Sequence, residues 1–78
     1  MADNTQVVTG TVRFFQFEGG FYAIRTGSNV VYDPTNLAPD FQHDGLRVRA
    51  RILPRNDLVS AHGAGQIVDI ESIEPLWN

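Results

Sequence analysis

Five short runs of β-branched and aromatic residues, separated by turn-forming residues, occupy most of the 78-residue chain. Valine, isoleucine, threonine and the aromatic residues favour extended backbone, while the glycine, proline, asparagine and aspartate between the runs favour turns. Many short strands at regular spacing are typical of an all-β sandwich or barrel. The predicted strands cover residues 6–17, 21–25, 30–32, 46–53 and 66–76.

The segment between the third and fourth predicted strands, residues 34–45, has a different pattern. Two prolines and an Asp-Gly pair exclude a continuous strand here, because proline cannot donate a hydrogen bond to a neighbouring strand. Leu37 and Phe41 are four residues apart, a spacing that brings both side chains to the same side of one short helical turn. The predicted order is therefore three strands, a short helix and two strands.

Three features accompany this order: Gly10 within a long first strand, the helical turn after the third strand, and the Asp44-Gly45 pair before the fourth. A glycine inside a strand indicates a bulge or a sharp coil of the sheet. In these features the chain resembles the small stand-alone OB-fold domains of bacteria. The resemblance covers nearly the whole chain and implies an all-β fold, a five-stranded OB-like Greek-key barrel with one short helix between strands 3 and 4. An SH3-like barrel fits the strand count but usually lacks a helix at this position.

A chain of this length forms one small domain. We expect residues 6–76 to form that domain and residues 1–5 to be a disordered N-terminal tail. The first six residues, MADNTQ, have neither the basic start nor the apolar run of a signal peptide, and the longest apolar run is shorter than a membrane span. We therefore expect a cytoplasmic protein without a membrane partner. The alternative is a secreted chain from which a signal peptide has been removed.

Side chains alternate between the two faces of a strand, so one apolar set per strand is expected inside the barrel. The run LRVRARI, residues 46–52, shows this alternation most clearly, with valine, alanine and isoleucine between arginines. The predicted core consists of Val8, Val12, Phe14, Tyr22, Ile24, Val31, Leu37, Phe41, Val48, Ala50, Ile52, Val68 and Ile70.

The same alternation turns three arginines to the outer face of the fourth strand. These are Arg47, Arg49 and Arg51. The fourth and fifth strands are antiparallel neighbours in an OB-type barrel, so we predict that the arginines lie opposite Asp69 and Glu71. We interpret the arrangement as a solvated charge ladder in which each cross-strand pair contributes about 0.2–1 kcal/mol. The alternative is that Arg51, or Arg55 beyond it, is left free for an anionic ligand.

The first predicted hairpin is rich in aromatic residues, and adjacent residues of a strand cannot all face the core. If Phe14 and Tyr22 point inward, their neighbours form an exposed patch. The members of this patch are Arg13, Phe15, Phe17, Phe21 and Arg25. OB-folds bind ligands on such surfaces, with bases stacked on aromatic rings and arginines close to phosphates. Two alternatives are an interface with a protein partner or a second copy, and burial of the rings by a bulge at Gly10 or by loops.

The charge balance bears on the choice of ligand. The chain has six basic residues, all of them arginine, and nine acidic ones, for a formal net charge of −3. Nonspecific affinity for nucleic acid comes mainly from neutralised phosphates, so an acidic protein is poorly suited to coat DNA or RNA. We therefore expect a non-catalytic binding module for a protein partner or a homodimer. Single-stranded nucleic acid or an oligomeric anionic ligand on the same face is the alternative. Arg55 is a further candidate, because loops between strands 4 and 5 contribute to OB-type binding.

Residues for covalent or metal chemistry are sparse. The absence of cysteine and lysine excludes thiolate zinc sites, thiol nucleophiles and Schiff bases. Asp57 and Ser60–His62 supply the residue types of a hydrolytic triad, but no nucleophile elbow surrounds the serine. His43 and its neighbouring aspartates match no standard metal-ligand spacing. We therefore expect no enzymatic activity, no cofactor and no metal.

Overall fold

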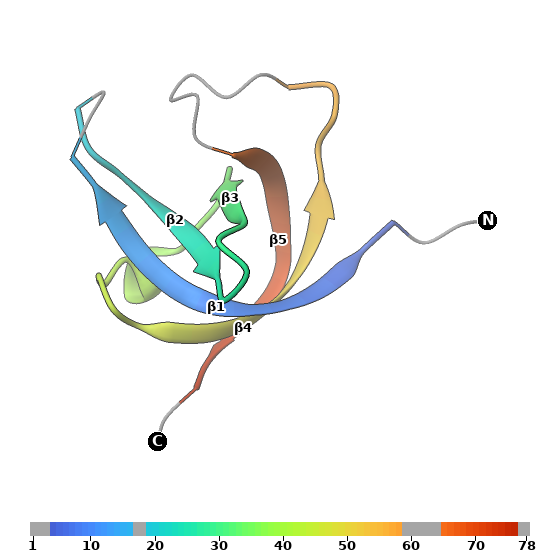
Figure 1. The fold of residues 1–78 in the computed structure, drawn as a ribbon. Coiled ribbons are helices and arrows are strands. Elements are labelled where there is room, and N and C mark those ends of the chain that lie inside the picture. The colour runs from blue at the N-terminus through green and yellow to red at the C-terminus, as the bar shows by residue number, and fades with distance from the viewer. Residues whose placement is uncertain (1–3, 17–18, 59–64, 77–78) are drawn as a thin grey trace.

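The computed structural model describes residues 4–16, 19–58 and 65–76, and over these residues the chain forms five strands and one short 3-10 helix (Figure 1). The predicted all-β fold and the predicted order of elements are confirmed. Residues 1–3 of the expected tail lie outside the described part of the chain. The elements are β1 (Gln6–Phe15), β2 (Phe21–Thr26), β3 (Val31–Pro34), η1 (Pro39–Phe41), β4 (Arg47–Pro54) and β5 (Gln66–Pro75).

The strands close into a barrel in the order β1-β2-β3-β5-β4. The long strand β1 closes the barrel because it pairs with two neighbours, with β4 through residues 6–11 and with β2 through residues 10–15. β3 and β5 are parallel, and the other neighbours are antiparallel. This is the predicted five-stranded OB-like Greek-key barrel, with η1 between β3 and β4.

Gly10 lies in the part of β1 that pairs with both β4 and β2. It is opposite Thr26 of β2 and Val48 of β4. A Cβ atom on Gly10 would lie 2.7 Å from the carbonyl oxygen of Arg25 and 2.8 Å from Cγ2 of Ile24, which is closer than real Cβ contacts. The register with both partners runs regularly through this residue. The glycine therefore permits a close crossing of strands and does not mark a bulge.

The core follows the predicted alternation, most clearly in β4, whose burial pattern alternates between exposed and buried residues from Arg47 to Ile52. Burial of a valine or isoleucine side chain contributes about 1.5–3 kcal/mol, so a few such residues hold a domain of this size together. The buried cluster consists of Val12, Ile24, Val48, Ala50, Ile52 and Val68, and the alternation predicts all of them. The partly buried residues packed against it are Val8, Tyr22, Tyr32, Leu37, Phe41, Leu46, Ile70 and Ile73.

Phe14 is an exception, because it is 42% exposed and its predicted place in the core is wrong. At this position β1 pairs only with β2, and the β1–β2 hairpin extends past the rest of the barrel (Figure 1). Phe14 is the cross-strand partner of Tyr22, and the two ring centroids are 5.0 Å apart. The backbone N–H of Phe14 donates to Oδ1 of Asp44 at 2.9 Å, so the turn before β4 holds this end of β1.

Candidate functional site

The outer face of β4 and β5 carries a ladder of ion pairs. Arg49 is opposite Glu74 and donates two hydrogen bonds to Oε1 of that carboxylate, from Nε at 2.9 Å and from Nη2 at 2.7 Å. Nε of Arg51 lies 3.5 Å from Oε1 of Glu71. All four side chains are about half exposed. Exposed pairs of this kind contribute about 0–1 kcal/mol each, so the ladder has a modest structural role.

The predicted partners of this ladder are only partly correct. The alternation predicts Asp69 and Glu71, and only Glu71 has that role. Asp69 lies opposite Leu53 instead. The register between β4 and β5 shifts between Arg51 and Ile52, and such a shift changes which residues face one another beyond it.

Arg55, directly after β4, is held by two carboxylates. Its Nε and Nη2 donate to the two carboxylate oxygens of Asp57 at 2.9 and 2.8 Å, and its Nη1 donates to Oδ2 of Asp69 at 2.8 Å. The hydrogen bond from Arg55 lowers the pKa of Asp57 to about 2. Hydrogen bonds from Thr35 and then from Arg55 lower the pKa of Asp69. These carboxylates already balance the charge of Arg55, which argues against its predicted role in binding a ligand.

Three arginines from three strands gather around Thr11 of β1. Thr11 is directly opposite Arg25 of β2 on one side and Arg47 of β4 on the other. Neighbouring strands are about 4.8 Å apart, so the backbones of Arg25 and Arg47 are separated by about 10 Å. Arg13 follows Thr11 on the same face of β1. Together these residues border a hollow of about 420 Å³, and we call this surface the arginine face. Its lining residues are Thr9, Gly10, Thr11, Arg13, Arg25, Thr26, Gly27 and Arg47.

The arginine face differs from the ladder in its charge balance. Arg13 forms an exposed ion pair with Asp44, with 3.6 Å between Nε and Oδ1, which is similar to the pair of Arg51 and Glu71. Among residues 4–16, 19–58 and 65–76, no carboxylate lies within ion-pair distance of Arg25 or Arg47. Arg49, Arg51 and Arg55 are paired as well, so Arg25 and Arg47 differ from the other four arginines. A protein with a net negative charge therefore keeps a local positive surface here.

The chemistry of this surface suits an anion. A guanidinium group binds carboxylate and phosphate oxygens through pairs of N–H donors in a fixed planar geometry. Threonine hydroxyls line the same hollow and can also donate hydrogen bonds. A ligand with more than one anionic group matches three guanidinium groups on neighbouring strands.

The aromatic part of the predicted patch lies farther along the same hairpin. Phe15 and Phe21 are cross-strand partners, with ring centroids 5.2 Å apart and ring planes at 54°. Phe15 is half-buried and Phe21 is only 9% exposed, so the exposure that alternation predicts for Phe21 is wrong. Ala23, which is opposite Arg13, is fully buried as well. At the beginning of β2, the face that carries Phe21 and Ala23 is therefore buried, although the alternation predicts that this face is exposed.

Four predicted site residues lie on one hairpin face: Arg13, Phe15, Phe21 and Arg25. Arg55 is engaged elsewhere, and Phe17 lies outside the described residues. Sequence reasoning assigned Arg47 to the ladder and so missed its place on the arginine face. The signal that identifies it is the pairing of β1 with β4, which places Arg47 beside Thr11.

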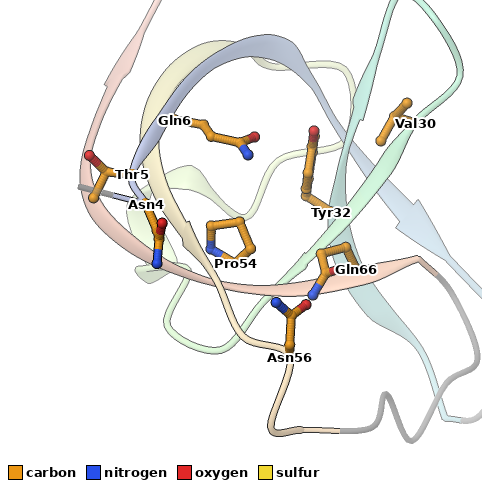
Figure 2. A pocket seen from close by; sticks show the side chains of 8 residues that line it. All are labelled: Asn4, Thr5, Gln6, Val30, Tyr32, Pro54, Asn56 and Gln66. Atoms are coloured by element: carbon orange, nitrogen blue, oxygen red, sulfur yellow. The ribbon is translucent and has the colours of Figure 1, made fainter. Parts of the chain in front are cut away.

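A second hollow, of about 660 Å³, opens at one end of the barrel (Figure 2). We call it the barrel mouth. Sequence reasoning missed it, because it forms only where barrel closure brings together the starts of β1, β3 and β5 and the end of β4. None of the described side chains that line it carries a charge, in contrast to the arginine face. The lining residues are Asn4, Thr5, Gln6, Val30, Tyr32, Pro54, Asn56 and Gln66.

The described residues contain no group of three or more histidine, aspartate or glutamate side chains placed to hold a metal ion. They also contain no helix with the length and apolar character needed to cross a membrane. Ser60 and His62, which supply two of the residue types of a hydrolytic triad, lie outside the described part of the chain. No protein-family model matches the sequence, and no curated protein is significantly similar to it.

Proposed function

We propose that the protein is a non-catalytic binding module that holds an oligomeric anionic ligand on the arginine face. The observation that carries the proposal is the unequal pairing of the arginines. Arg25 and Arg47 have no carboxylate partner in the described part of the chain, whereas Arg49, on the same face of β4 as Arg47, has one. Unpaired guanidinium groups remain available to an external anion.

The exposure of the arginine face favours an oligomer over a single ion. An exposed ion pair contributes only about 0–1 kcal/mol, so useful affinity requires several contacts at once. An oligomer supplies them, because its second anionic group binds at a high effective concentration once the first is in place. Three guanidinium groups around one hollow provide the matching set of contacts.

A titration with matched variants tests this proposal. The probe is a fluorescently labelled single-stranded oligonucleotide of about 12 nucleotides, a length within the range that OB-folds cover. The double variant Arg25→Gln with Arg47→Gln should weaken binding at least about 10-fold, or ~1.4 kcal/mol, because two charge-assisted contacts are lost.

The matched control is Arg49→Gln with Arg51→Gln, which removes the same charge from the ladder. It should weaken binding less than about 3-fold, because these arginines are already paired. Equal losses in the two double variants would show that net charge alone governs binding. The proposal would then fail.

A protein partner, the first expectation from the sequence, is a second candidate, and one observation favours it. Phe14 is 42% exposed and lines, together with Tyr22, a hollow of about 360 Å³. Aromatic residues are enriched at protein interfaces. If the protein self-associates through this ring, Phe14→Ser should lower the average mass in light scattering at high protein concentration. An unchanged average mass would show that the protein does not self-associate through Phe14.

A further inference from the structure

The barrel mouth has the chemistry of a site for a neutral ligand with hydrogen-bonding edges. The side chains of Gln6, Tyr32 and Asn56 have no hydrogen-bond partner among the described residues. Gln66 is held in place, because its Nε2 donates to two backbone oxygens at 3.1 and 3.0 Å, which leaves Oε1 as an acceptor. Within the described part of the chain, the mouth thus offers the unpaired side-chain amides of Gln6 and Asn56 and the unpaired hydroxyl group of Tyr32.

These groups match the edge and the face of a nucleobase. An amide side chain presents a donor and an acceptor side by side, as the edge of a base does. Figure 2 shows Gln6 and Tyr32 pointing into the same space, with Asn56 and Gln66 along one side of it. Tyr32 packs against the core and also lines the mouth, so its ring is a supported surface on which a base can stack. The volume of about 660 Å³ lies within the range of small-molecule sites.

The barrel mouth and the arginine face meet at the β2–β3 turn. The backbone N–H of Thr26 donates to the carbonyl oxygen of Val30 at 2.9 Å, and this bond closes the turn. Thr26 and Gly27 line the hollow of the arginine face, while Val30 lines the mouth. One extended ligand can therefore reach both surfaces by crossing a single turn.

We infer that the ligand is a single-stranded nucleic acid, with phosphates on the arginine face and one unpaired base in the barrel mouth. This inference rests on the proposed function and names its ligand class. In each nucleotide the neutral base and the negatively charged phosphate are separate groups. They match the barrel mouth, which has no charged side chain among its described residues, and the cationic arginine face beside it. In an acidic polysaccharide the charges sit on the rings themselves, so each ring would bring an anion into a mouth whose described lining has no cation to balance it.

The test compares two probes with the same number of phosphates, an oligonucleotide of about 12 nucleotides and an abasic oligomer of the same length. The wild-type protein should bind the base-bearing strand about 5- to 100-fold more tightly, the range that stacking of one base supplies. Gln6→Ala with Asn56→Ala should lower that preference by about 5-fold or more, because two hydrogen bonds to the edge of the base are lost, and should leave the affinity for the abasic oligomer unchanged. Both residues are exposed, so the fold should survive the change.

Tyr32→Phe separates stacking from hydrogen bonding, because it removes the hydroxyl group and keeps the ring. It should retain most of the preference for the base-bearing strand. Arg25→Gln with Arg47→Gln should lower the affinity for both probes by a similar factor and leave the preference intact.

The outcomes distinguish the two claims. If the wild-type protein binds both probes equally and the arginine variants weaken both, the barrel mouth does not bind a base. The inference would then be overturned, and the proposed function would stand. Arginine variants without effect on either probe would overturn the proposed function. Binding of a neutral disaccharide that the Gln6 and Asn56 changes abolish would assign the mouth to sugars and overturn the inference.

Discussion

Arg47 and Arg49 lie two residues apart on the outer face of β4, and only Arg49 has a carboxylate partner among the described residues. Glu74 accepts two hydrogen bonds from Arg49. The two arginines have the same side chain and lie on the same face of the same strand. They differ in that Arg49 is held by a carboxylate, whereas Arg47 has no such partner in the described part of the chain.

Neutral replacements of these two arginines should differ in their effect on stability. Arg49→Gln should lower the free energy of unfolding by less than about 1 kcal/mol, because an exposed ion pair is lost. Arg47→Gln should change it by no more than about 0.5 kcal/mol, since it removes no pair. Urea denaturation measures both. A larger loss for Arg47→Gln than for Arg49→Gln would be inconsistent with the pairing described here.

An aspartate in the core should prevent folding. Val48 is fully buried, and an unpaired carboxylate there costs more free energy than a small domain can absorb. Val7 is 64% exposed and opposite Arg51, so Val7→Asp is a matched control for the same chemical change. In thermal melts followed by circular dichroism, Val48→Asp should show no cooperative transition and Val7→Asp a normal one. A normal melt of Val48→Asp would disprove the register of β4.

The two glycines Gly10 and Gly27 should respond differently to alanine. A Cβ on Gly10 would clash with the backbone of Arg25, whereas a Cβ on Gly27 would have no atom within 4 Å apart from its own residue and its two chain neighbours. Gly10→Ala should lower the free energy of unfolding by about 1–3 kcal/mol. Gly27→Ala should be neutral or stabilise by about 0.4–1 kcal/mol, because it reduces the freedom of the unfolded chain. Equal stability of the two variants in urea would contradict the close crossing at Gly10.

Local alternation predicts the interior of this protein better than its surface. Val48 and Ile52 are buried because each strand has one side turned to the same interior, whichever strand lies beside it. Contacts on the outer face depend on the register between strands and on which strands pair when the barrel closes. Neither can be predicted from the sequence of one strand alone. The shift between Arg51 and Ile52 changes the ladder partners, and the pairing of β1 with β4 brings Arg47 beside Thr11.

The network around Arg55 should make stability depend on pH in the acidic range. The folded-state pKa of Asp57 is about 2, below its ordinary value of 3.8, so the ionised carboxylate stabilises the folded state. This contribution is complete above 3.8 and is lost as the pH falls through about 2. The lowered pKa of Asp69 acts in the same direction.

The variant Arg55→Gln removes the hydrogen-bond donor that these two carboxylates share. The free energy of unfolding, measured by denaturant titration at a series of pH values, should fall less steeply with acid in this variant than in the wild-type protein. Parallel pH profiles for the two proteins would show that Arg55 does not stabilise the ionised forms of Asp57 and Asp69.

The salt dependence of oligonucleotide binding measures how many phosphates the arginine face neutralises. Each neutralised phosphate of a single strand contributes about −0.7 to the slope of log K against log salt, so the two unpaired arginines, Arg25 and Arg47, predict a slope of about −1.4. Arg25→Gln with Arg47→Gln should bring the slope close to zero, while Arg49→Gln with Arg51→Gln should leave it at about −1.4. The same slope in all three proteins, or an equal reduction in both double variants, would contradict the arginine face as the binding surface.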